Sequence, residues 1–182
     1  MALTLKQALA ASSLTIGMMA SCASHAFSLN GTIWTSAETK GVDPYLLYAV
    51  ALAESKKVNG KVVRPWPWAV NVAGKGYWFS DLREAEAFVD SQLNAGVRNM
   101  DIGPLQINVL WHGHRVTNPK ELFHLPTAVS VGADILSEAL ASAPNDLALA
   151  VGRYHNWKDS DRARVYGTRV LMYRKLMVEA GR

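Results

Sequence analysis

The sequence predicts a mainly α, α+β fold in which a single helical domain carries a small β-hairpin lobe. Two observations favour it. An apolar run over residues 45–53, and several later segments, place apolar side chains at helical spacing. One stretch, 60–79, is too rich in Pro and Gly for a helix, but it has β-branched and aromatic residues on either side of a Gly-Lys-Gly turn. With 182 residues and 49% hydrophobic content, the chain can bury one sizeable core.

The first 26 residues are typical of an export signal. Lys6 is the only early charge, residues 9–19 are mostly apolar, and small residues precede a cleavage site after Ala26. The apolar run is too short for a membrane span. We therefore expect a signal peptide over 1–26 and a periplasmic domain over 27–182.

A second interpretation of the same region involves the only cysteine. Residues 19–22 resemble a bacterial lipobox, in which Cys22 becomes the lipidated N-terminus and anchors the protein in the outer membrane. If cleavage instead follows Ala26, no cysteine remains for a disulfide or for thiol chemistry.

Charge and ligand-type residues exclude other classes of partner. The formal net charge of +4 comes without a basic run, so we expect no nucleic-acid partner. His112 and His114 lie two residues apart on a predicted loop and lack cysteine or carboxylate partners. We therefore expect no metal and no cofactor.

The first two predicted helices follow directly. Residues 28–40 form a short helix that Gly41 ends. The second runs over 44–57, because Asp43 can cap a helix N-terminus and Pro44 fits the first turn.

Glu54 lies near the end of this second, apolar helix. It shares a stripe with Leu47, Val50 and Ala51. One interpretation is a half-buried carboxylic acid kept ready to donate a proton, because an apolar setting disfavours an ionised carboxylate. The other is a polar helix end that emerges into water.

The Pro- and Gly-rich stretch predicts a hairpin around residues 74–76. Trp66, Trp68, Tyr77 and Trp78 crowd into it. They form either a stacking wall beside a cleft, since ring faces pack on the apolar faces of sugars, or a satellite core beneath a long loop.

Further helices and one polar turn complete the chain. Residues 80–84 look like a capping box that opens a helix to Asn94. Residues 99–108 combine a Gly-Pro break with amides, which suits a turn that aims Gln106 and Asn108 inward. Apolar stripes predict three more helices, over 127–143, 147–157 and 160–180. The stripes are Val129, Ala133, Leu136 and Leu140; Leu147, Ala150, Val151 and Tyr154; and Tyr166, Val170, Tyr173 and Met177.

Three separated motifs resemble one family. Ala53-Glu54-Ser55 on an apolar helix, Asp101-Ile-Gly-Pro-Leu-Gln-Ile-Asn108, and Ala150-Val-Gly-Arg-Tyr-His-Asn156 are similar to the signatures of soluble-type lytic transglycosylases (the SLT domain). Pro104-Leu105 stands where that family has Leu-Met, and His155 is inserted into its Ala-Tyr-Asn motif. The Pro-Trp-Pro-Trp segment at 65–68 resembles an insertion in members encoded with conjugation and integrating elements, close to the VirB1-like group.

The resemblance implies a lysozyme-like domain with a catalytic cleft and a peptidoglycan substrate. Such enzymes cleave the β-1,4 bond between N-acetylmuramic acid and N-acetylglucosamine and leave a 1,6-anhydro product. Glu54 would act alone, first as acid and then as base, although most glycosidases use two carboxyl groups. Implied partners are peptidoglycan glycan strands and proteins of a secretion or conjugation apparatus.

The family likeness also assigns roles to individual residues. Gln106 and Asn108 would hold the sugar's amide and hydroxyls, Ser55 would support its N-acetyl group, and Tyr154 would orient Glu54. Asp101 is either a structural turn-former or a second carboxylate.

Two other functions stay open. A goose-type lysozyme reaction would use water in place of the sugar's 6-hydroxyl. A non-catalytic peptidoglycan-binding assembly subunit would keep the cleft without turnover.

Overall fold

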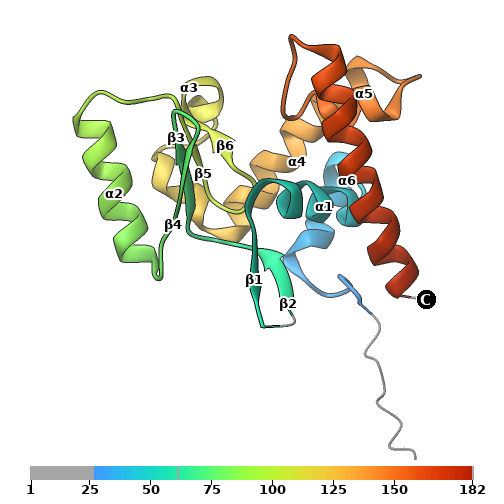
Figure 1. Cartoon of the computed structure of the whole chain (residues 1–182), viewed down its shortest axis with the longest axis horizontal. Coiled ribbons are helices and arrows are strands. Elements are labelled where there is room, and N and C mark those ends of the chain that lie inside the picture. Colours follow the sequence, from blue (N-terminus) through green and yellow to red (C-terminus); the bar gives the residue numbers. More distant parts are fainter. Residues whose placement is uncertain (1–26, 61, 182) are drawn as a thin grey trace, which may run out of the picture.

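The computed structural model describes residues 27–60 and 62–181 and is mainly helical (Figure 1). The predicted signal peptide and Cys22 lie outside the described residues. Within them, no helix is long and apolar enough to cross a membrane. The helices are η1 (Ile33–Lys40), α1 (Pro44–Ser55), α2 (Leu82–Asn94), α3 (Val109–His112), η2 (Gly113–Arg115), η3 (Pro119–Phe123), α4 (Leu125–Ser142), α5 (Leu147–Gly152) and α6 (Ser160–Ala180). The strands are β1 (Lys56–Asn59), β2 (Val62–Pro65), β3 (Ala69–Val72), β4 (Lys75–Trp78), β5 (Met100–Ile102) and β6 (Ile107–Asn108).

Helix α1 begins as the sequence predicts. The Asp43 carboxylate accepts a hydrogen bond from the Tyr45 amide at 2.8 Å, and Pro44 occupies the first turn. The helix ends at Ser55, two residues before the predicted end, because Lys56 enters β1. Glu54 is therefore held in the last helical turn.

The strands form two antiparallel sheets. Strands β1 and β2 make a separate hairpin, which the sequence interpretation missed. The second sheet has the order β4-β3-β5-β6. The predicted hairpin is confirmed as β3–β4, and its turn lies at Ala73 and Gly74, whose φ values of 51° and 86° suit a tight hairpin turn.

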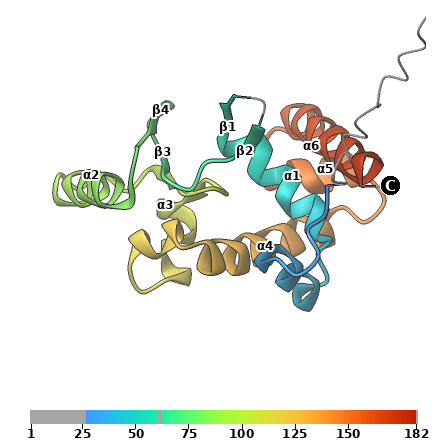
Figure 2. The ribbon, with the colours of Figure 1, turned by 90° about the horizontal axis from the view of Figure 1, so that it is seen from below.

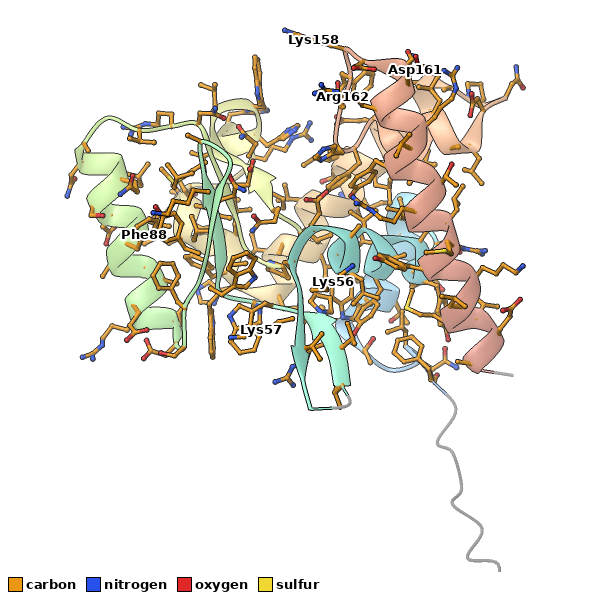
Figure 3. All side chains as sticks on the ribbon, viewed as in Figure 1. Lys56, Lys57, Phe88, Lys158, Asp161 and Arg162 are labelled. Carbon is orange, nitrogen blue, oxygen red and sulfur yellow. The ribbon has the colours of Figure 1, made fainter. Side chains whose placement is uncertain are left out.

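Helix α2 covers this sheet on one side. Asp81 caps the helix by accepting from the Glu84 amide at 2.9 Å, and Glu84 in turn accepts from the Ser80 hydroxyl at 2.7 Å. Phe88 packs on the strand side, with its ring centroid 4.6 Å from that of Tyr77 (Figure 3). The capping box expected at 80–84 is thus present only in part, because Asp81 caps the helix but Glu84 bonds back to Ser80 rather than to the amide of the N-cap Asp81.

The core centres on α1. In Figures 1 and 2, α1, α5 and α6 lie on one side and the four-stranded sheet with α2 lies on the other. Helix α4 spans the two sides, along the lower edge of the molecule in Figure 2. Most predicted stripes are buried, including Val129, Leu136 and Val170. Leu147 is an exception, because its side chain at the start of α5 is 54% exposed.

Helices α5 and α6 approach backbone to backbone. A Cβ at Gly152 would lie 1.8 Å from the Ala163 carbonyl oxygen, and one at Gly167 would lie 1.9 Å from that of Ala148. Helix α5 ends at Gly152, so residues 153–157 form turns rather than the predicted helix. This close contact between α5 and α6 holds Gly152, the last residue of α5, in place.

Candidate functional site

A cavity of about 750 Å³ opens between the sheet and the helical side of the molecule. Its lining includes Glu54 from α1, Asp101, Gln106 and Asn108 from the region of β5 and β6, and Tyr154 after α5. Its size falls in the range of ligand pockets. Four of the five predicted site residues, all except Ser55, thus lie at one cavity.

Glu54 is the half-buried acid of this cavity. Its side chain is 14% exposed, and its Oε1 accepts a hydrogen bond from the Tyr166 hydroxyl at 2.5 Å. Burial, followed by the nearby Glu54 charge, raises the pKa of Tyr166 well above its usual 10.0, so the phenol stays a donor. The interpretation of Glu54 as a solvated helix end is therefore wrong.

Tyr154 does not hold Glu54 as expected. Its hydroxyl donates to the Leu105 carbonyl at 2.9 Å, which ties the segment after α5 to the loop between β5 and β6. Burial is the largest cause of its raised pKa, and the Glu54 and Asp101 charges add to it. The orienting role belongs to Tyr166 instead, while Tyr154 fixes the cavity wall.

Gln106 is presented by a strained turn. Its backbone has a φ of 46°, in the left-handed region, and its side-chain nitrogen donates to the Ala69 and Gly103 carbonyls at 3.1 and 2.9 Å. These bonds occupy the amide nitrogen and leave Oε1 to accept from a ligand. Gly103 is required here, because a Cβ would lie 2.1 Å from the Leu122 carbonyl oxygen.

The side-chain amide of Asn108 is hydrogen-bonded within the protein. Its side-chain nitrogen donates to Asp101 Oδ1 at 2.8 Å and to Asn99 Oδ1 at 3.1 Å, and its oxygen accepts from the Trp111 amide at 3.2 Å, capping α3. Although Asn108 lines the cavity, its amide shapes the wall rather than offering free hydrogen-bonding groups.

Asp101 is a strand residue that lines the cavity. It also accepts a hydrogen bond from Asn108, its partner across the β5–β6 turn, so both interpretations of Asp101 stay open. Burial raises the pKa of Asp101, the Glu54 charge adds to the rise, and the hydrogen bond from Asn108 opposes it. The cavity thus holds a second carboxyl group beside Glu54.

Ser55 lies behind the cavity. Its side chain is 1% exposed, and its hydroxyl donates to the Pro104 carbonyl at 2.7 Å while accepting from the Trp66 amide at 3.1 Å. Ser55 joins α1 to two later segments and does not line the cavity, so any support that it gives to a sugar's N-acetyl group would act through these segments.

Aromatic residues border the cavity, but not those that the sequence suggested. Trp66 packs edge to face on Trp68, with ring centroids 5.8 Å apart, and neither lines the cavity. Trp111 and Trp157 do line it, and they are 65% and 54% exposed. Two half-exposed indoles at one cavity are suited to packing on an apolar ligand face.

Two functional side chains were missed from the sequence. Tyr166 was assigned only to a buried stripe, although a buried tyrosine hydroxyl needs a partner, which was the available signal. His155 was treated as a departure from a motif, but its Nδ1 lies 3.7 Å from Glu54 Oε1.

The described residues contain no cluster of three or more His, Cys, Asp or Glu side chains that could hold a metal ion. Comparisons with protein-family models, with curated proteins and with solved structures found no match to this chain.

Proposed function

We propose that this chain is a peptidoglycan lytic transglycosylase with a lysozyme-like fold. The observation that carries the proposal is Glu54, a carboxylic acid only 14% exposed at a cavity of about 750 Å³, with one oxygen fixed by Tyr166. A positioned, largely buried acid that reaches a cavity is what general acid catalysis on a glycosidic bond requires.

In the proposed reaction, Glu54 acts twice. Because the Tyr166 hydroxyl donates to Oε1, the transferable proton resides on Oε2. Glu54 protonates the glycosidic oxygen as the bond from the anomeric carbon to that oxygen breaks, and the sugar's own N-acetyl oxygen bonds to the anomeric carbon. The Glu54 carboxylate then takes the proton of the 6-hydroxyl, whose oxygen displaces the N-acetyl oxygen and closes the 1,6-anhydro ring.

The rest of the cavity suits a glycan strand. Gln106 Oε1 can accept from an amide N–H or hydroxyl of the sugar, since its nitrogen is already used by two carbonyls. Trp111 and Trp157 supply stacking surfaces at the rim. We propose that the protein acts after export, in the periplasm, where it opens the cell wall locally for a secretion or conjugation apparatus.

One observation favours a hydrolase as the second candidate. Asp101 lines the same cavity, and hydrolytic glycosidases use two carboxyl groups. In that reaction a water, activated by the second carboxylate, replaces the 6-hydroxyl.

Purified peptidoglycan tests the proposal. The wild-type protein should clear it, and the isosteric Glu54→Gln variant, with an unchanged melting temperature, should not. Clearing by Glu54→Gln would refute the proposal. Binding of sacculi by both proteins without turnover would instead support a non-catalytic assembly subunit.

A further inference from the structure

His155 is fixed in place by the tight packing of α5 on α6. Its amide donates to the Gly152 carbonyl at 3.0 Å, and Gly152 itself has no room for a side chain against Ala163. The backbone of His155 is therefore held directly after α5, and the residue lines the cavity that also contains Glu54.

The imidazole of His155 contacts two side chains: Glu54 and Tyr166, the tyrosine that donates a hydrogen bond to Glu54. It stacks on the Tyr166 ring, with centroids 4.7 Å apart and an angle of 3° between the planes. Its Nδ1 lies 3.7 Å from Glu54 Oε1, the oxygen that accepts from the Tyr166 hydroxyl. At that distance the contact with Glu54 is an ion pair rather than a hydrogen bond.

Charged groups from three elements face this imidazole. Interaction with Glu54 on α1 is the largest cause of a raised pKa of His155, and Asp101 on β5 raises it further. Burial and Arg169 on α6 lower it. Arg169 lies 5.3 Å from the Tyr166 ring centre.

A second hollow, of about 380 Å³, lies on the α6 side of the same imidazole. Its lining includes Asp161, Arg162 and Arg169. Asp161 and Arg162 lie near the N-terminal end of α6, as Figure 3 shows, and Arg162 is already paired with Asp159 at 3.2 Å. The acidic and basic groups on this side partly offset one another, whereas Glu54 forms an ion pair with this imidazole at 3.7 Å.

We infer that His155 is a positioning residue for Glu54: its ring fixes Tyr166 by stacking, and its imidazolium forms a coupled ion pair with the Glu54 carboxylate. The His155 side chain is 53% exposed, so solvent weakens this ion pair without abolishing it.

The coupling has a consequence for catalysis that rests on the proposed function. A protonated imidazole 3.7 Å from Glu54 Oε1 stabilises the carboxylate that remains once the acid has given its proton to the leaving oxygen. His155 therefore assists that proton transfer.

An NMR titration tests the pair without any turnover. The His155 ring signals of the full chain are followed against pH in the wild type and in Glu54→Gln, which keeps the shape of the side chain and removes its charge. The His155 midpoint should fall in the variant, because the Glu54 charge that raises the pKa of His155 is gone. Exposed His124, at the start of α4, is the internal reference, and its ring signals should be the same in both proteins. An unchanged or higher His155 midpoint would overturn the inference.

A pH profile of peptidoglycan cleavage tests the same coupling from the other side. His155→Phe keeps an aromatic ring over Tyr166 and removes the charge. The pH profile of kcat/KM should lose the part that follows the His155 charge, whereas His124→Phe should keep the wild-type profile. An unchanged profile in His155→Phe contradicts the coupling. Absence of cleavage in the wild type would refute the proposed function, while the NMR midpoint would still decide the inference.

Discussion

The Tyr166 hydroxyl is the contact on which the proposed chemistry of Glu54 depends most. In Tyr166→Phe the ring, which is 4% exposed and stacked on His155, keeps its volume and its packing. Only the donor to Glu54 Oε1, at 2.5 Å, is lost. The variant should therefore keep the fold, with a melting temperature lowered by the loss of that one hydrogen bond.

The expected loss of activity follows from the strength of that hydrogen bond. A bond to a charged acceptor contributes about 1.5–3 kcal/mol, which corresponds to about 10- to 150-fold in rate. The loss should fall on kcat, because Tyr166 does not line the large cavity and does not bind substrate there. Initial rates of peptidoglycan solubilisation at several substrate concentrations separate kcat from KM.

Tyr173→Phe is the matched control for this measurement. Tyr173 lies two turns further along α6, where its hydroxyl accepts from Lys56, and it is absent from the lining of the large cavity. The control should keep full activity. If Tyr166→Phe is as active as the wild type, or if Tyr173→Phe loses as much, Tyr166 does not orient the acid.

Three further predictions, with four substitutions and one control, test the cavity and its supports. Burial raises the pKa of Asp101, so ionisation of this carboxyl group lowers the free energy of unfolding. This loss of stability is absent below pH 3.8, the usual pKa, grows as the pH rises through it, and is complete above the raised pKa. Asp101→Asn should thus melt higher than the wild type at neutral pH, match it in strong acid and stay active; an inactive variant with an intact fold would favour hydrolysis. Trp111→Ala and Trp157→Ala should each weaken binding of sacculi about 3- to 10-fold, whereas Trp78→Ala, outside the cavity but 54% exposed, should not; equal losses in all three would contradict stacking. Ser55→Ala should lower the free energy of unfolding by about 1–3 kcal/mol, because buried partners lose their hydrogen bonds, and an unchanged urea midpoint would refute this.

Local signals in the sequence predicted the helices well. Asp43 caps α1, Gly41 takes a φ of 69° after η1, and the stripes that contain Val129 and Val170 are buried. These features depend on neighbours within a few residues. The β1–β2 hairpin was missed because Val58, Val62 and Val63 are 49% exposed or more, so no buried face marks it.

The roles of side chains in the cavity depend on distant packing, which a sequence does not display. Tyr154 and Tyr166 both point inward, but only their tertiary surroundings determine that one bonds to Leu105 and the other to Glu54. Ser55 likewise faces Pro104 because α1 ends against that loop. The motifs predicted which segments meet, but not which atoms bond.

The central claim is that Glu54 works alone as acid and then as base. The masses of the products released from purified peptidoglycan test it most directly. The account predicts muropeptides lighter by one water than the hydrolysed products, released by the wild type and absent with Glu54→Gln. Release of the heavier, water-containing products by the wild type would contradict it and would assign Asp101 to the reaction.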